Sequence, residues 1–198
     1  FYCDVVVVGG GLAALSAAIS AADNGATVLL VNKGITGSSG SSAKAAGILA
    51  AAFGHGDIET RPVPDTPNKH ARDTLEVGHH IGDPELVHFV TKQAISAVQW
   101  LENLGVVFSR AEDNGYIQLN APGNSCPRAV SAIGGGQAIV SALLRQAEAK
   151  GVMFLDETIV RDIKPIDGHQ FVVKLQGRQT TTITSGAAVL AAGGATGL

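Results

Sequence analysis

Apolar and polar positions follow one another in blocks that predict an α/β chain, beginning with an apolar run at residues 5–8. Four consecutive valines in this run predict a short strand that is buried on both faces. Three glycines follow, and the alanine-rich stretch 12–22 then predicts a helix. A second apolar run at 26–31 predicts another strand. This order of strand, glycine turn, helix and strand is typical of an α/β domain with a parallel sheet.

Two more helices are predicted in the middle of the chain. Residues 69–80 carry apolar side chains at helical spacing. Asp83 and Pro84 predict the start of a long helix, because aspartate caps free N–H groups and proline suits the first helical position. Gly105 predicts its end. We expect Trp100 in the core and an apolar helix face made of Leu86, Phe89, Val90, Ala94, Ala97, Val98, Leu101 and Leu104.

Two less regular segments separate these elements. Residues 35–48 are small and rich in hydroxyl groups, and we expect a loop that runs into an apolar helix across 45–53. A flexible Gly/Ser linker is the alternative, which the apolar residues 45–53 disfavour. Residues 57–68 are polar and rich in proline, which predicts a surface segment.

The rest of the chain predicts a loop, a helix and several strands. The strands include an antiparallel pair, so we expect a small β-meander before the last strand. A buried strand that ends in a glycine turn is expected at 187–197. The other expected elements are a strand at 106–108, a loop at 116–128, a helix at 137–150, strands at 152–155 and 158–163, and the pair 171–175 and 179–184.

Composition and charge exclude several classes of protein. The chain has 198 residues and a net charge of -3, which suits one domain with its own core and gives no electrostatic basis for binding nucleic acid or an anionic membrane. Only two cysteines are present, so we expect no disulfide framework and a reducing, cytoplasmic location. We expect no membrane span and no secretory signal. The chain lacks an initiator Met, and we expect a fragment of a longer protein.

The glycine turn carries the chemistry that this pattern suggests. Gly9, Gly11 and Ala14 give the form G-x-G-x-x-A. Gly9 permits the tight turn, Gly11 lets a pyrophosphate approach the backbone, and Ala14 keeps helix and strand close. A diphosphate would lie on the free N–H groups at the positive end of the helix dipole. The alternative is a glycine turn that binds no nucleotide.

The residue after the second strand departs from the usual dinucleotide pattern. An acidic residue normally holds the ribose hydroxyls at this place. Asn32 stands there instead, followed by Lys33, and asparagine can bond a ribose without charge. This departure disfavours a generic NAD site.

Gly134 to Gly136 form a second possible anion-binding helix start, with a simple turn before a packing helix as an equal alternative.

Other reactive side chains give weaker signals. His79 and His80 are adjacent, so on a helix they would point to different faces and would not share a metal. We therefore expect surface histidines and no metal site. Cys3 and Cys126 are expected to be small buried or loop residues, with an active-site thiol as the alternative for Cys126.

Several segments together resemble one family. The resemblance covers essentially the whole chain and is carried by Val8-Gly9-Gly10-Gly11-Leu12-Ala13-Ala14, Asn32-Lys33-Gly34, 38–48, Asp73-Thr74-Leu75-Glu76-Val77-Gly78, Gly82-Asp83-Pro84-Glu85-Leu86-Val87, Trp100-Leu101-Glu102-Asn103-Leu104-Gly105-Val106 and Ala191-Ala192-Gly193-Gly194. These segments resemble the flavin-binding domain of the succinate dehydrogenase/fumarate reductase flavoprotein superfamily, which includes L-aspartate oxidase. The resemblance implies a Rossmann-like, glutathione-reductase-type α/β FAD-binding domain over 1–198, with a helical insertion and a small β-meander.

The resemblance also implies which residues would meet FAD. The glycine turn would meet the pyrophosphate, residues 32 and 33 would lie near the adenosine ribose, and the backbone of residue 160 could contact the adenine. The flavin end would be lined by the serine loop and the segment after it. The implied cofactor-binding residues are Gly9, Gly10, Gly11, Leu12, Ala13, Ala14, Asn32, Lys33, Ser38, Ser39, Ala45, Ala46, Gly47, Val160, Ala191, Ala192 and Gly193.

Two departures from the family pattern matter for function. Membrane-bound members attach FAD to a histidine in the loop that corresponds to residues 37–47, and this loop has none. The resemblance therefore implies noncovalent FAD, as in the L-aspartate oxidase branch. Residues 116–128 resemble the substrate loop of that branch, but Ala121 stands where the branch has a glutamate and Asn124 where it has a histidine. These differences argue against L-aspartate as the substrate. Arg128 is a candidate partner for a substrate carboxylate, with a structural salt bridge as the alternative.

These expectations lead to one principal hypothesis and two alternatives. The principal one is an FAD-dependent oxidoreductase acting on a C4 dicarboxylate or related acid, in which this chain supplies the FAD-binding part and a partner chain or further segment supplies the rest. No catalytic residue is identified, because the family's proton-transfer residues lie outside the matching segments. The alternatives are a noncatalytic flavin- or nucleotide-binding module and an NAD(P)-dependent Rossmann dehydrogenase. The absence of repeated βαβ units after residue 31 disfavours the dehydrogenase.

Overall fold

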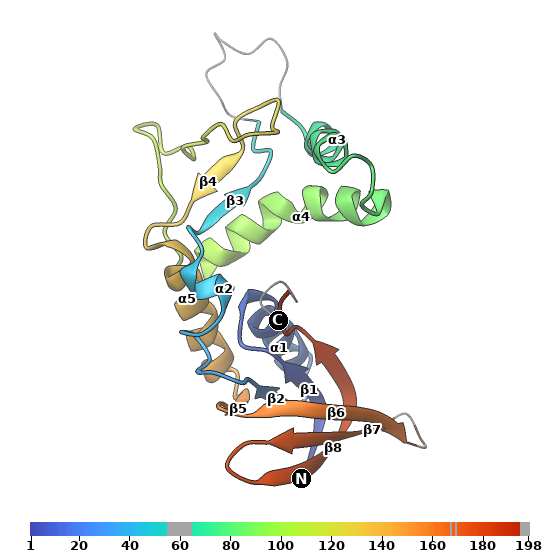
Figure 1. Cartoon of the computed structure of the whole chain (residues 1–198). Helices are drawn as coiled ribbons and strands as arrows, with labels where there is room; N and C mark the ends of the chain where they lie inside the picture. Colours follow the sequence, from blue (N-terminus) through green and yellow to red (C-terminus); the bar gives the residue numbers. More distant parts are fainter. Residues whose placement is uncertain (55–64, 167, 169, 195–198) are drawn as a thin grey trace. The chain divides into compact units, whose positions relative to one another are not determined.

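The computed structural model describes residues 1–54, 65–166, 168 and 170–194. The chain divides into two compact units (Figure 1). The first consists of Phe1–Ala45 and Gly136–Leu198, and the second of Ala46–Gly135. Each unit is described by itself below.

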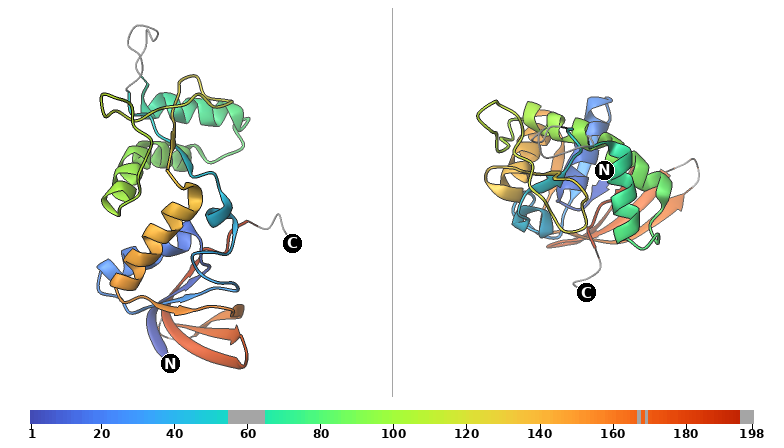
Figure 2. Two further views of the ribbon diagram at one scale, coloured as in Figure 1. Left: turned by 90° about the vertical axis from the view of Figure 1, so that its left-hand side faces the viewer. Right: turned by 90° about the horizontal axis from the view of Figure 1, so that it is seen from above.

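The first unit is built on a six-stranded sheet in the order β5-β2-β1-β8-β7-β6. Strands β5, β2, β1 and β8 are parallel neighbours, whereas β8, β7 and β6 pair antiparallel. Figure 2 shows the last three strands as one curved ribbon in orange to red. The strands are β1 (Tyr2–Val8), β2 (Val28–Val31), β5 (Met153–Leu155), β6 (Ile159–Ile166), β7 (Gln170–Gln176) and β8 (Thr180–Leu190).

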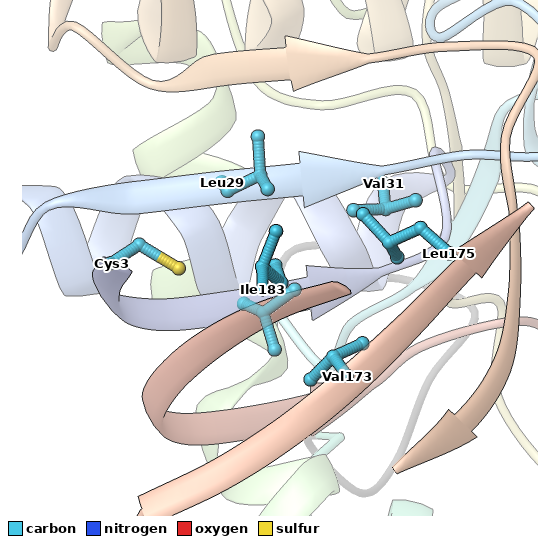
Figure 3. Packing of buried hydrophobic residues seen from close by; sticks show 7 residues of the cluster. Cys3, Leu29, Val31, Val173, Leu175 and Ile183 are labelled. Atoms are coloured by element: carbon cyan, nitrogen blue, oxygen red, sulfur yellow. The ribbon is translucent and has the colours of Figure 1, made fainter. Parts of the chain in front are cut away.

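The meander strands and the parallel strands share one cluster of buried side chains. A cluster of buried side chains joins β1 and β2 to β7 and β8, and Figure 3 shows these side chains facing one another. Burying each aliphatic side chain of this kind contributes about 1.5–3 kcal/mol. The cluster consists of Cys3, Val6, Leu29, Val31, Val173, Leu175 and Ile183.

Among the described residues, three helices belong wholly or mainly to the first unit. α1 (Leu12–Asp23) packs on β1, β2 and β8, and it lies behind the strands in Figure 3. Its buried residues Ala14, Leu15, Ala18 and Ile19 recur at the three- and four-residue spacing of one helix face. The others are the short α2 (Ser41–Lys44) and α5 (Gly135–Ala149).

In the described part of the second unit, 46–54 and 65–135, two helices and one strand pair are present. α3 (Pro67–Val77) and α4 (Pro84–Asn103) pack on each other, and β3 (Ile48–Ala50) pairs antiparallel with β4 (Ala129–Ser131). The Asp83 carboxylate accepts hydrogen bonds from the N–H groups of residues 85 and 86, which confirms the expected helix start. Gly105, with a φ of +88°, ends α4 as expected.

The main fold prediction is confirmed, and the expected β-meander is present. The first strand, the glycine turn, the first helix and the helix after Gly134 all form close to the expected positions. The meander differs in one respect, because it continues the main sheet through β8. The sequence predicts one strand at 179–184 and a second at 187–197 that ends in a glycine turn, whereas a single eleven-residue strand runs through the first and into the start of the second. Its residues 180–185 pair with β7, and its residues 184–190 pair with β1.

Two local predictions are wrong, and a third falls mainly outside the described residues. The apolar segment 45–53 forms no helix; instead it contains β3, because β4 supplies a partner strand that the local pattern does not show. Residues 106–108 form no strand and contribute a single bridge, between Phe108 and Ala132. The predicted surface segment 57–68 lies outside the described residues over 57–64, and Asp65 beyond it is buried.

Burial also differs from the sequence pattern in two places. The expected apolar face of α4 is buried only toward its C-terminal half, at residues such as Val98 and Leu101, whereas Leu86, Phe89 and Val90 are exposed. Trp100 is half-buried and thus only partly in the core. The end of β8 differs from the expected buried strand, because Leu190 there is exposed; residues 195–197 of the expected turn lie outside the described residues.

Candidate functional site

The turn between β1 and α1 lies in close contact with the segment that follows β8. Gly9 has a φ of +126°, and a Cβ on it would lie 2.1 Å from the carbonyl oxygen of Ala191. Ala191 is fixed there because its N–H donates to the carbonyl of Val8 at 2.8 Å. Glycine at position 9 is therefore required both by its backbone conformation and by the segment that follows β8.

The N-terminus of α1 begins at a residue that has no side chain. Gly11 is the N-cap, so no cap side chain can occupy the N–H groups of the first turn. The Ser42 hydroxyl accepts one of them, the N–H of Leu12, at 3.2 Å. A Cβ on Gly11 would lie 2.9 Å from this Ser42 oxygen. The helix thus presents N–H groups and the positive end of its dipole next to a hydroxyl group.

Asn32 lies against the same turn. It is buried, with 7% of its surface exposed, and a Cβ on Gly10 would lie 2.3 Å from its Nδ2 atom. Its backbone is held on both sides, since its N–H donates to Leu155 and its carbonyl accepts from Thr158. The Asn32 amide group is therefore packed directly beside the glycine turn, at the carboxyl end of β2.

The second unit contains a buried ion-pair cluster around Arg128. The Arg128 side chain has no exposed surface; its Nε and Nη2 atoms donate to the Asp65 carboxylate at 2.7 and 2.8 Å. Its Nη1 atom donates to Asp73 at 2.6 Å and to the Asn124 side-chain oxygen at 3.2 Å. The guanidinium group is thus fully engaged inside the unit, which supports the structural salt bridge and not the partner of a substrate carboxylate.

Charges in this cluster shift two pKa values. Burial alone would raise the pKa of Asp73, but hydrogen bonds from Ser125 and Arg128 outweigh it and lower the pKa to about 2. Burial lowers the pKa of His70, and the Arg128 charge lowers it further against the opposing effect of Asp65 and Asp73. The Nδ1 atom of His70 is buried and has no hydrogen-bond partner among the described residues. Burial and the fixed positive charge of Arg128 therefore both favour the neutral form of His70.

Tyr116 anchors the start of the predicted loop 116–128. Its ring stacks on Phe53 with 4.1 Å between centroids, and the Arg110 guanidinium lies 3.7 Å above it. The Tyr116 hydroxyl donates to the Glu102 carboxylate. Burial and this negatively charged partner raise the pKa of Tyr116 to about 12. These contacts give the loop a structural attachment to α4.

The adjacent histidines lie on the surface, as the sequence predicts. His79 and His80 are exposed and follow the end of α3. Within residues 1–54, 65–166, 168 and 170–194, no group of three or more His, Cys, Asp or Glu side chains is placed to hold a metal ion. In the same part of the chain, no helix combines the length and the apolar content that a membrane span needs. Cys3 and Cys126 are both free and buried.

Comparison with known proteins decides the family. A family model described as an FAD binding domain matches residues 4–198. The chain belongs to this FAD-binding domain family. Related proteins include a component of the fumarate reductase (CoM/CoB) of Methanothermobacter marburgensis, 28% identical over 98% of this chain, and an L-aspartate oxidase of Neisseria meningitidis, 31% identical over 97%. The chain spans 36% and 37% of the lengths of these two relatives.

Solved structures show the same fold. E. coli quinol fumarate reductase FrdA superposes with a TM-score of 0.87 at 26% identity, covering 98% of this chain and 33% of that one. A flavocytochrome c3 fumarate reductase gives a TM-score of 0.80 at 27% identity, covering 96% of this chain and 33% of that one. The predicted fold class and the resemblance to this superfamily are thereby confirmed.

The FAD-binding domain brings together only part of the predicted cofactor residues. The turn and the start of α1, Asn32, and the segment after β8 meet at one end of the parallel strands. Lys33 is exposed beside Asn32, and Ala45 ends α2. Ala46 and Gly47 belong to the second unit. Ala192 and Gly193 follow Ala191 and are exposed.

The remaining predicted contacts have other surroundings. Ser38 is exposed, whereas the Ser39 hydroxyl donates to the Ile35 carbonyl at 2.7 Å and accepts from Asn32 at 3.1 Å. Val160 lies in β6 opposite Leu175 and packs against the core cluster. Ser39 therefore acts within the fold, and its role at the flavin end stays a prediction.

The groups at the turn fit the diphosphate of FAD. A Cβ at Gly9, Gly10 or Gly11 would meet another atom within 3.0 Å, so side chains are excluded from this surface by the fold itself. The uncapped start of α1 supplies N–H donors that suit a doubly charged anion. When bound, FAD supplies the redox chemistry, and the chain's residues bind and orient it.

Three residues of this site were missed by sequence reasoning. Ser42 was passed over within the serine-rich loop, although its hydroxyl is the one that reaches α1. Thr36 and Asp156 are 120 positions apart in sequence and are joined by two hydrogen bonds. No local signal marks such a pair, because each residue is ordinary within its own segment.

Proposed function

We propose that this chain is the FAD-binding part of an oxidoreductase that acts on a C4 dicarboxylate or a related acid. The observation that carries the proposal is the side-chain-free turn of Gly9 to Gly11 at the uncapped start of α1, in a chain of the FAD-binding domain family. The relatives named as fumarate reductases and L-aspartate oxidases support the substrate class.

Noncovalent attachment of FAD is part of the proposal. Residues 37–47 correspond to the loop that carries the flavin-linked histidine in membrane-bound relatives, and none of them is a histidine. Binding of FAD by this chain would then rest on noncovalent contacts alone. A cytoplasmic location, a carboxylate substrate and a partner chain or further segment that completes the enzyme also belong to the proposal.

Among the acids, we favour a dicarboxylate without an α-ammonium group. Ala121 offers no charge to an ammonium group, and the side-chain oxygen of Asn124 accepts a hydrogen bond from Arg128. Arg128 itself is fully engaged by Asp65 and Asp73, so substrate carboxylates would need other cationic residues. Fumarate or succinate fits this description better than L-aspartate does.

Anaerobic flavin spectroscopy on the full-length protein tests this proposal. The bound flavin is reduced chemically, and fumarate or, in a parallel sample, iminosuccinate is added. We expect fumarate to restore the oxidised spectrum and to yield one succinate per flavin. A flavin that neither acid reoxidises, and that neither succinate nor L-aspartate reduces, would support the noncatalytic binding module instead.

A further inference from the structure

The orientation of the Asn32 amide is fixed by two hydroxyl groups. Its Nδ2 atom lies 3.4 Å from Thr36 Oγ1 and 3.1 Å from Ser39 Oγ. An asparagine side chain can turn its oxygen and nitrogen ends around, and only its hydrogen-bond partners decide between the two orientations. The partners of these hydroxyls therefore determine whether the nitrogen or the oxygen of Asn32 faces them.

Each of the two hydroxyls already donates its single hydrogen bond to another acceptor. Thr36 Oγ1 donates to Asp156 Oδ1 at 2.6 Å, and the Thr36 N–H donates to Asp156 Oδ2 at 3.1 Å. Ser39 Oγ donates to the Ile35 carbonyl at 2.7 Å. A hydroxyl has only one proton, so both oxygens can only accept from Asn32. The nitrogen of Asn32 must face them, and its oxygen Oδ1 must face the other way.

The Asn32 oxygen is consequently left as an available acceptor, whereas the nitrogen is the end of the amide that lies beside Gly10. No group among the described residues donates a hydrogen bond to this oxygen, and it is not one of their fully buried polar atoms. Its position after β2 is where a dinucleotide site receives the ribose hydroxyls. A carboxylate accepts with either oxygen, whereas an amide accepts with one end only. A chain that carries asparagine here therefore gains from a device that sets the amide orientation.

We propose that Thr36 and Asp156 are positioning residues, which hold Asn32 so that its oxygen accepts a hydrogen bond from the adenosine ribose of FAD. This inference rests on the proposed function. Asp156 accepts a hydrogen bond from the Thr36 hydroxyl, Thr36 accepts one from the Asn32 amide nitrogen, and the Asn32 oxygen would accept one from a ribose hydroxyl. Asp156 and Thr36 do not themselves touch the ribose in this arrangement.

The test compares two nucleotides that differ only at the ribose. ADP and 2′,3′-dideoxy-ADP are titrated against the full-length protein after removal of FAD. In the unmodified protein we expect ADP to bind about tenfold more tightly, the effect of one buried hydrogen bond. Thr36→Val has nearly the same shape and lacks the hydroxyl, so the ratio should fall below about threefold. Thr36→Ser retains the hydroxyl and should preserve the ratio.

A second variant guards against a folding defect. Asp156→Ala leaves Asn32 and its two partners in place but frees the Thr36 proton to turn toward Asn32, so the ratio should also fall. A ratio that stays near tenfold in folded Thr36→Val or Asp156→Ala protein overturns the inference. If the unmodified protein binds neither FAD nor ADP, the proposed function itself fails. Full FAD binding with an unchanged ratio in the variants overturns only the positioning role.

Discussion

Gly9→Ala should be among the most damaging single-methyl substitutions in this protein. The added Cβ would lie 2.1 Å from the Ala191 oxygen and 2.7 Å from its carbonyl carbon. Both are backbone atoms, and Ala191 is tied to Val8 by a 2.8 Å hydrogen bond, so neither can rotate away. Relief requires β1 and β8 to part at this end. The positive φ adds about 1–3 kcal/mol of strain, and a lost strand hydrogen bond adds about 1 kcal/mol.

The expected loss for Gly9→Ala is therefore about 2–4 kcal/mol in the free energy of unfolding. Urea denaturation of the FAD-free protein, followed by circular dichroism, measures it through the shift of the midpoint at constant slope. Gly25→Ala is the matched control: its φ is +83°, and no atom lies within 4 Å of the added Cβ. That variant should lose only the strain of a left-handed backbone, about 1–2 kcal/mol. Equal losses in the two variants would refute the close approach of the Ala191 segment.

Three further predictions concern the ion-pair cluster and α1. Arg128→Ala should lower the free energy of unfolding by about 3–5 kcal/mol in urea denaturation, since it leaves Asp65 and Asp73 as buried charges. The control Arg72→Ala, at an exposed residue, should cost under about 0.5 kcal/mol. A similar cost for both variants would contradict the buried cluster. The pKa of Asp73 is about 2 in the folded protein against an ordinary 3.8. Its contribution to the free energy of unfolding, about 2 kcal/mol, is therefore present above pH 4 and lost as the pH falls through 2. Asp73→Asn should make the free energy of unfolding depend less on pH between pH 5 and 2, and an unchanged slope would contradict the shift. Ser42→Ala should weaken FAD binding about tenfold in a fluorescence titration, and unchanged affinity would exclude its hydroxyl from the site.

The parts of the fold that local pattern controls could be predicted from the sequence. The valine run of β1 is apolar because both faces of the strand are covered, and Asp83 with Pro84 starts α4 by hydrogen bonding within a few residues. The helix predicted for segment 45–53 is wrong, since its alanines suit either structure and only β4 decides. The pattern divides the single strand β8 in two for the same reason: its partners change along its length.

The candidate site divides in the same way. The glycine turn could be predicted because its function imposes a spacing on neighbouring residues. The Thr36–Asp156 pair and the Arg128–Asp65 pair could not, since their members are 120 and 63 positions apart and fold topology alone brings them together. Distance in sequence, and not the strength of the interaction, separates what was predicted from what was missed.

Flavin analysis of the purified full-length protein tests the central claim most directly. Its visible spectrum is recorded, the protein is precipitated with acid, and the supernatant is analysed by chromatography. Noncovalent binding at the glycine turn predicts a yellow protein that releases FAD into the supernatant, about one per chain. Flavin retained in the pellet would contradict noncovalent attachment, and a colourless protein that takes up no added FAD would contradict the FAD site itself.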